Sequence, residues 1–236
     1  MIIIWIKEYF LYILLAVAAI FGFFWLTQYK NKLNISEGMA LVLSILHTLV
    51  GVVCVKVFSF LESFEPGGMS LFGAIFFMPI FYFAGAKIFK RKTADVFDIF
   101  TICILFTLLC ARINCIKSGC CLGCAIPGTD ELRWPTRELE IVFYIVMLVW
   151  FGRKAGKPKF AGRIYPLYMI LYGAFRFVEE WFRETTNPVG FFHISHIWAL
   201  ISIAVGAGIY YYQTRMSQSK KCRKEKSFCR NKEEKK

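Results

Sequence analysis

The sequence is poor in charged residues over long stretches, and it lacks the alternation of polar and apolar residues that β-barrel strands show. Charged residues make up 19% of the 236-residue chain and hydrophobic residues 57%, and the mean hydropathy is +0.52. This composition excludes an ordinary soluble domain, in which about a quarter of the residues are charged. Apolar runs of about 20 residues, long enough to cross a membrane as helices, recur along nearly the whole chain. The sequence therefore predicts an all-α, polytopic membrane protein rather than a barrel.

The apolar opening of the chain also lacks two features of a secretory signal peptide. It has no positively charged start and no evident small-residue cleavage site, so we interpret it as a retained first helix. The apolar runs predict about seven transmembrane helices, near residues 2–26, 38–61, 69–89, 95–111, 138–152, 163–183 and 192–212. Residues 1–212 would form one transmembrane catalytic domain with a loop-rich external site. The basic tail that follows, residues 213–236, is predicted to be disordered.

The net charge of +13 does not indicate nucleic-acid binding, because the basic residues lie where membrane topology requires them. Ten Lys and Arg residues fall in the tail and others cluster in alternate short loops, whereas the connections 62–68 and 184–190 contain no Lys or Arg. By the positive-inside rule, the tail is cytoplasmic, the amino terminus is external, and the segment 112–137 faces the exterior. We expect the basic tail to be attracted to anionic membrane lipids.

The segment from Arg112 to Gly123 places an arginine at the end of an apolar run, before a loop rich in glycine and cysteine. An arginine at membrane depth is costly unless it meets a phosphate, a carboxylate or water, so Arg112 is a candidate functional residue; the alternative is an arginine whose head reaches the interface. The spacing of the loop cysteines lacks the two separated pairs of a structural zinc site, which argues against a metal. A redox pair and partly buried, packed or disulfide-linked thiols both stay open. The loop cysteines are Cys115, Cys120, Cys121 and Cys124, and the redox pair would be Cys121 with Cys124.

A second polar stripe lies on the sixth predicted helix. Tyr172, Arg176 and Glu180 are four residues apart and therefore share one helix face, which Arg183 continues. An Arg176–Glu180 pair alone could be structural. Because Arg112 is predicted at the same external depth, we expect Arg112, Arg176 and Tyr172 to form a pocket for one lipid phosphate. Glu140, one turn inside the fifth predicted helix, would either partner an arginine or accept a proton.

These segments resemble motifs of the bacterial prolipoprotein diacylglyceryl transferase family. The segment Arg112–Gly123 is similar to a divergent form of the family signature, and the segment Tyr172–Arg183 is similar to the family's late helix. Pro135-Thr136 with Glu140 is similar to an intervening element, and an early glycine motif also has a counterpart. The signature reads Arg112-x-x-Cys115-x-x-x-Gly119-Cys120-Cys121-x-Gly123, and the glycine motif reads Gly67-Gly68-x-Ser70 with Gly73.

The resemblance implies an enzyme of the bacterial plasma (inner) membrane that transfers diacylglyceryl from phosphatidylglycerol to the lipobox cysteine thiol of a preprolipoprotein and releases glycerol phosphate. It implies that Arg112 and Arg176 bind the phosphate and stabilise the leaving charge. Tyr172 would orient the lipid, and Glu180 with Arg183 would fix the arginine geometry. The implied partners are phosphatidylglycerol, the lipobox peptide and membrane lipids, and no metal or soluble cofactor is implied. Further substrate contacts are implied for Gly67, Gly68, Ser70, Gly119 and Gly123.

Two departures from the family pattern leave the general base and the acceptor open. Pro66 stands where the family usually has a histidine, and Cys115 and Cys120 stand at its usual asparagine and glutamate. Glu140 is then the first candidate base and the loop thiols the second, and another thiol or an amine could be the acceptor. Two competing hypotheses are a quinone-linked membrane thiol oxidoreductase that uses the Cys121–Cys124 pair, and a lipid transporter or binding scaffold without chemistry.

Overall fold

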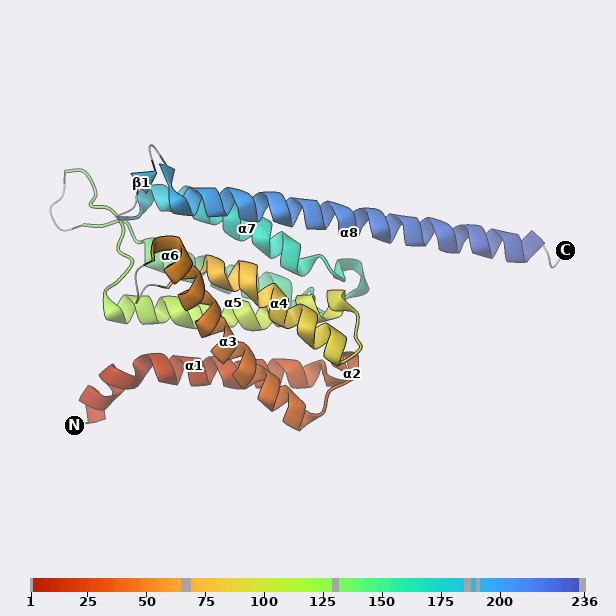
Figure 1. Cartoon of the computed structure of the whole chain (residues 1–236), viewed down its shortest axis with the longest axis horizontal. Coiled ribbons are helices and arrows are strands. Elements are labelled where there is room, and N and C mark those ends of the chain that lie inside the picture. The colour runs from red at the N-terminus through yellow and green to blue at the C-terminus, as the bar shows by residue number, and fades with distance from the viewer. Residues whose placement is uncertain (1, 65–68, 129–131, 185–187, 190–191, 234–236) are drawn as a thin grey trace.

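The computed structural model describes residues 2–64, 69–128, 132–184, 188–189 and 192–233. Its long helices form a bundle, in which α1, α5 and α8 run along the long axis of the molecule (Figure 1). The long helices are α1 (Ile2–Gln28), α3 (Glu37–Ser63), α4 (Phe72–Ile88), α5 (Thr93–Ser118), α6 (Thr136–Gly152), α7 (Ile164–Glu179) and α8 (Ile194–Glu233). The short elements are α2 (Lys30–Leu33), the 3-10 helices η1 (Pro158–Phe160) and η2 (Glu180–Phe182), and the antiparallel two-residue strands β1 (Pro188–Val189) and β2 (Phe192–His193).

Four helical segments in the described part of the chain are long and apolar enough to cross a membrane, namely Tyr9–Gln28, Glu37–Glu62, Thr93–Ser118 and Ile194–Gln218. The helices α4, α6 and α7 have 17, 17 and 16 residues. At about 1.5 Å per residue they are somewhat shorter than a hydrocarbon core of about 30 Å. The prediction of an all-α, multi-pass membrane protein is therefore confirmed, whereas the number of seven membrane-crossing helices is not.

Three helix boundaries differ from the sequence prediction by four residues or more. Helix α5 continues past residue 111 to Ser118, so Arg112 lies inside the helix rather than at its end. Helix α7 ends at Glu179, and the chain continues as η2. Helix α8 runs to Glu233, so most of the segment 213–236, predicted to be disordered, is helical. Lys, Arg, Glu and Gln are good helix formers, and here they extend a helix that is already nucleated.

Asp98 in α5 ties that helix to the start of α7. Its two carboxylate oxygens accept hydrogen bonds from the backbone N–H groups of Gly162 (2.6 Å) and Ile164 (3.1 Å). The first N–H groups of a helix have no partner within it, so a carboxylate from another helix can cap them. The buried carboxylate thus fixes the packing of α7 on α5, which is the pair of helices that carries the two arginines identified above.

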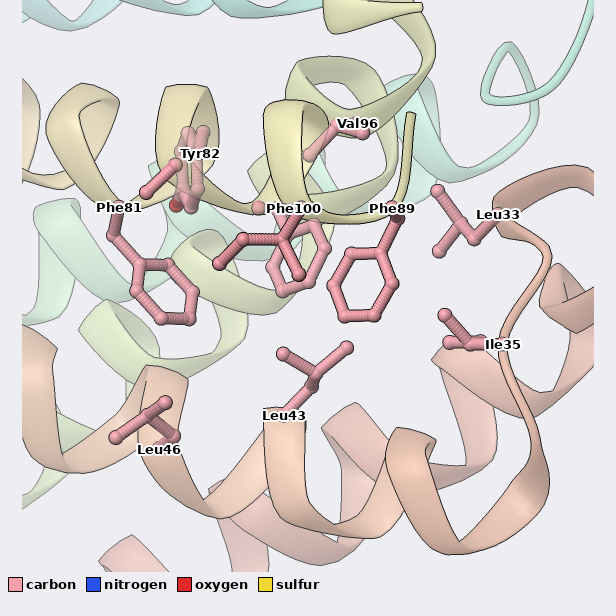
Figure 2. Close-up of a pocket in the computed structure, with 12 residues that line it drawn as sticks. Leu33, Ile35, Leu43, Leu46, Phe81, Tyr82, Phe89, Val96 and Phe100 are labelled. Carbon is pink, nitrogen blue, oxygen red and sulfur yellow. The ribbon is translucent and has the colours of Figure 1, made fainter. Parts of the chain in front are cut away.

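The two ends of the bundle differ in chemistry. The amino terminus, the segment after α5 and the strand pair lie at one end, which we call the site end, and α8 projects beyond the other (Figure 1). Away from the site end, a cavity of about 250 Å³ opens between α3, α4 and α5 (Figure 2). Side chains such as Leu43, Phe89 and Phe100 line this cavity, and its described lining contains no charged residue. It therefore suits hydrocarbon rather than a charged ligand.

Candidate functional site

The centre of the site end is a cluster of buried charges contributed by three helices. Arg112 belongs to α5, Glu140 to α6 and Arg176 to α7. The Oε2 atom of Glu140 pairs with Nε of Arg112, and its Oε1 atom accepts a hydrogen bond from Nη1 of Arg176 at 3.3 Å. One carboxylate therefore joins the two guanidinium groups that the sequence analysis expected to converge.

Arg176 also contacts two carboxylates that follow it in the chain. Its Nη1 donates to Glu179 at 2.6 Å, and its Nη2 pairs with Glu180 at 2.8 Å. These residues lie three and four positions after Arg176, which is the spacing that brings side chains together on a helix face. The Arg176–Glu180 pair is as the sequence predicts. Glu179 is a residue that the sequence analysis missed, although its spacing from Arg176 could have identified it.

Burial makes these ion pairs dependent on one another. Arg112, Glu140 and Arg176 are 4%, 1% and 5% exposed. Moving a charge out of water costs several kcal/mol, and in a buried pair this cost is offset only while both partners are present. The network is therefore weak evidence for stability. Its main effect is to hold two guanidinium groups at a fixed separation and orientation.

A polar pocket of about 160 Å³ lies beside the charge cluster. The Tyr172 hydroxyl is buried and has no hydrogen-bond partner among the described residues, so a ligand with an acceptor atom would satisfy it. The expected grouping of Arg112, Arg176 and Tyr172 thus occurs in one pocket. The lining consists of Ser59, Glu62, Met69, Ser70, Leu71, Phe72, Arg112, Tyr172, Arg176, Glu180, Arg183 and Ser195.

Of the early glycine motif, the structure describes Ser70 and Gly73. Ser70 lines the pocket, but its backbone N–H donates to the carbonyl oxygen of Val55 at 3.1 Å and is not free to bind an anion. Pro66, Gly67 and Gly68 lie outside the described residues. Glu62, at the end of α3, interacts with the Ser70 side chain and was not predicted as a site residue. A carboxylate within an apolar helix is a signal that could have found it.

The two glycines of the loop after α5 shape the backbone. Gly119 ends the helix with a φ of 69°, a conformation that glycine adopts without strain. A Cβ atom on Gly123 would lie 2.1 Å from the carbonyl oxygen of Trp134, so only glycine fits there. Gly123 also forms a β-bridge with Arg183. Gly123 therefore lies close to the protein backbone at Trp134, whereas the sequence predicted that it lets the loop lie close to lipid.

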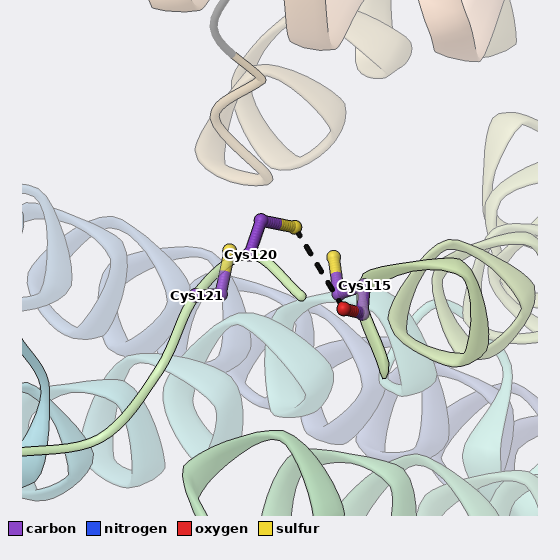
Figure 3. Close-up of side chains that lie close together, drawn as sticks. All are labelled: Cys115, Cys120 and Cys121. Atoms are coloured by element: carbon purple, nitrogen blue, oxygen red, sulfur yellow. Dashed lines mark hydrogen bonds between the residues drawn. The ribbon is translucent and has the colours of Figure 1, made fainter. Parts of the chain in front are cut away.

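Three of the loop cysteines lie close together (Figure 3). The Sγ atoms of Cys115, Cys120 and Cys121 all lie within 4.8 Å of one another. Nη1 of Arg112 donates to Sγ of Cys115 at 3.9 Å. A hydrogen bond from Cys115, together with the positive charges of Arg183 and Arg112, lowers the pKa of the Cys121 thiol to about 4. Cys124 is not a member of this group, and both Cys121 and Cys124 are free thiols rather than a disulfide.

Comparison with known proteins identifies similar sequences over nearly the whole chain. A family model described as prolipoprotein diacylglyceryl transferase matches residues 2–212. A phosphatidylglycerol–prolipoprotein diacylglyceryl transferase of Dehalococcoides mccartyi strain CBDB1 is 25% identical over 224 residues, covering 84% of this chain and 85% of the relative. The proteins of the same name from Clostridium tetani and Mannheimia succiniciproducens are 27% and 30% identical. These two alignments cover 51% and 57% of this chain and 55% and 54% of the relatives.

Proposed function

Because this chain belongs to the prolipoprotein diacylglyceryl transferase family, we propose that it transfers the diacylglyceryl group of phosphatidylglycerol to the lipobox cysteine of preprolipoproteins. The chain is a multi-pass membrane transferase. In the proposal it lies in the bacterial plasma membrane, with the site end and amino terminus external and the carboxyl terminus cytoplasmic. This orientation is supported by the basic residues that follow α1, α4 and α6 and by the basic end of α8.

The observation that carries the proposal is the convergence of Arg112 and Arg176 on one carboxylate beside one pocket. The pocket lining contains three arginines, Arg112, Arg176 and Arg183, together with two glutamates. Glu140 and Glu179 pair with the same arginines, so the proposal rests on the guanidinium donors in the lining and not on an excess of positive charge. Guanidinium groups bind phosphate oxygens with paired, charge-assisted hydrogen bonds. In the proposed reaction the same donors stabilise the charge that develops on the departing glycerol phosphate.

The remaining pocket residues have supporting roles in this reaction. Tyr172 donates its free hydroxyl to a phosphate or ester oxygen, and Arg183 lines the pocket and forms a β-bridge with Gly123. Glu180 positions Arg176 through their ion pair. Gly119 and Gly123 act through the backbone by placing the loop that borders the site. Ser70 contributes its side chain to the lining.

We assign proton acceptance to Glu62 rather than to Glu140. Both oxygens of Glu140 are occupied by arginines, and two adjacent positive charges oppose its protonation. Glu140 is therefore better suited to holding the arginines than to taking a proton from the acceptor thiol. Glu62 lines the pocket, and its hydrogen-bond partners are the neutral side chains of Ser70 and Trp198. It forms no direct ion pair among the described residues, so its carboxylate is better placed to accept a proton.

The test is an assay with purified protein, labelled phosphatidylglycerol and a lipobox peptide. We expect glycerol phosphate and a peptide heavier by one diacylglyceryl group to appear in equal amounts, and a peptide with serine in place of the lipobox cysteine to stay unmodified. Arg112→Gln and Arg176→Gln should each lower the rate by about 100-fold or more, as expected for removal of a donor to a developing negative charge. Arg163→Gln, at the opposite end of α7 from Arg176, is the matched control and should leave the rate unchanged.

Two results would contradict the proposal. Glycerol phosphate released without modification of the peptide would indicate hydrolysis or another acceptor. Binding of phosphatidylglycerol without turnover would indicate a lipid-binding protein. Assaying Glu62→Gln and Glu140→Gln under the same conditions tests the assignment of the base. Full loss of the chemical step with unchanged lipid binding is expected for Glu62→Gln, whereas Glu140→Gln should weaken lipid binding as well.

A further inference from the structure

We propose that Cys115, Cys120 and Cys121 form a zinc site with three thiolate ligands and one open coordination position, at which the acceptor thiol binds. This inference rests on the proposed transferase function, because it assigns the zinc ion the task of activating the thiol that receives the diacylglyceryl group. It concerns three cysteine side chains that have no part in the phosphate binding proposed above.

The distances fit a small ion with sulfur ligands. In a tetrahedral zinc site each Zn–S bond is about 2.3 Å long, which places the sulfur atoms about 3.8 Å apart. The three Sγ atoms already lie within 4.8 Å of one another, so small side-chain rotations are enough to close them on an ion (Figure 3). Sequence spacing argued against zinc because the cysteines do not form two separated pairs. The fold brings all three cysteines together. Cys115 lies in the last turns of α5, and the left-handed turn at Gly119 brings Cys120 and Cys121 back beside Cys115.

The surroundings offset the charge of the occupied site. Three thiolates and one Zn²⁺ carry a net charge of −1, and arginines surround the sulfur atoms. Arg112 donates to Sγ of Cys115, Arg137 donates to the carbonyl oxygen of Cys115 at 3.5 Å, and Arg183 interacts with Cys121. The Ser118 hydroxyl lies 3.2 Å from Sγ of Cys120, where it can act as an outer-shell hydrogen-bond donor. Cys120 is exposed, which gives an ion a path of entry.

Three protein ligands with an open fourth position are typical of a catalytic rather than a structural zinc site. Arg112 contacts Cys115 and also lines the polar pocket, so the sulfur cluster and the proposed phosphate site share this side chain. The acceptor S–H would bind zinc at the fourth position and give up its proton to the Glu62 carboxylate. The zinc-held sulfur then forms a bond to the glycerol carbon that bears the phosphate. The C–O bond to that phosphate breaks, its electron pair stays on the departing glycerol phosphate, and the thioether product leaves the zinc.

This role accounts for two observations together. The chain has cysteines beside Arg112 where the resemblance leads one to expect asparagine and glutamate, and its general base was left unassigned by the sequence. Binding to Zn²⁺ favours the thiolate form of a cysteine directly, so much less basicity is required of the protein. A carboxylate such as Glu62 is then a sufficient proton acceptor.

The first experiment measures metal binding by the full chain in detergent micelles. After removal of metal by a chelator, we expect the protein to take up one Zn²⁺ per chain, and Co²⁺ in its place to give the visible absorption of a tetrahedral thiolate site. Cys115→Ser, Cys120→Ser and Cys121→Ser should each weaken zinc binding by more than about 100-fold, which exceeds the usual effect of losing an outer-shell partner. Cys124→Ser is the matched control from the same loop and should bind zinc normally. Zinc uptake that is substoichiometric, or equal in all four variants, would overturn the proposal.

The second experiment separates this inference from the transferase assignment. The metal-free protein is assayed with phosphatidylglycerol and the lipobox peptide, before and after zinc is added back. We expect the rate to fall at least 100-fold without zinc and to recover with it, while binding of phosphatidylglycerol stays unchanged. A full rate in metal-free protein would overturn the zinc site's role and leave the transferase assignment intact. One bound zinc with no transfer from phosphatidylglycerol would support the site and refute the proposed substrates.

Discussion

Replacing Glu140 by glutamine tests the physical basis of the site most directly, because this carboxylate joins both arginines. The change keeps the shape of the side chain and removes its charge. Arg176 keeps Glu179 and Glu180 as partners, whereas Arg112 loses the carboxylate that pairs with it. Removing one partner of a buried ion pair costs about 3–5 kcal/mol of unfolding free energy. For a chain of this length, about 2–4 °C of melting temperature is lost per kcal/mol, so the melting temperature should fall by roughly 6–20 °C.

The same helix offers a matched control. Glu138 precedes Glu140 by two residues, its side chain is 49% exposed, and it lies 3.8 Å from Arg137. Exposed pairs of this kind contribute about 0–1 kcal/mol, so Glu138→Gln should shift the melting temperature by less than about 4 °C. Thermal unfolding of both variants would be followed by tryptophan fluorescence in lipid nanodiscs at one heating rate.

A double substitution adds an internal check. If Glu140 is needed chiefly to neutralise Arg112, then Arg112→Gln should recover part of the stability that Glu140→Gln loses, because no unpaired charge is left between α5 and α6. Equal melting temperatures for Glu138→Gln and Glu140→Gln, or simple additivity in the double variant, would refute the view that buried charges hold the arginines in place.

Three further predictions concern the cap at the start of α7, the tight approach at Gly123 and the reactivity of Cys121. Asp98→Ala should lower the unfolding free energy by roughly 2–5 kcal/mol, because two buried N–H groups at the start of α7 lose their acceptor, and chemical denaturation would measure this loss. Gly123→Ala should displace the loop from Trp134 and abolish transfer, with little change in the melting temperature of the helical bundle, and a normal transfer rate would contradict the tight approach. In metal-free protein, Cys121 should react with iodoacetamide even at a pH of about 5, because its pKa is lowered to about 4. Cys115→Ala should raise this pKa and slow the reaction at the same pH, as mass spectrometry of the labelled peptide would show.

The helices and the polar face of α7 could be predicted from sequence because both depend on local regularities. Apolar runs of membrane length indicate helices without knowledge of their neighbours, and the spacing of Tyr172, Arg176 and Glu180 places them on one face of any helix. The family motifs added the expectation that Arg112 belongs with that face. These parts of the prediction required no knowledge of how the helices pack.

The bridging role of Glu140, the position of Glu62 and the sulfur cluster could not be predicted in this way. Whether Glu140 faces one arginine or two depends on the rotation of α6 relative to α5 and α7, which no local pattern determines. Glu62 reaches the pocket because of the path of α3 across the bundle (Figure 1). The grouping of Cys115 with the two later cysteines depends on α5 extending to Ser118, whereas the apolar run that predicts the helix stops near residue 111.

The ion pairs of Glu140 with Arg112 and Arg176 constrain the order in which the helices can insert into the membrane. During synthesis α5 emerges first, and Arg112 has no counter-ion until α6 delivers Glu140. An arginine without a counter-ion costs about 2.5–3.5 kcal/mol at the centre of a membrane helix, and this is an upper bound for Arg112, which lies nearer the end of α5. Arg176 arrives later together with its own carboxylates, Glu179 and Glu180, and completes the network of ion pairs. We therefore expect α5, α6 and α7 to leave the insertion machinery as one group, and a chain truncated before α6 to retain Arg112 at the lipid headgroups.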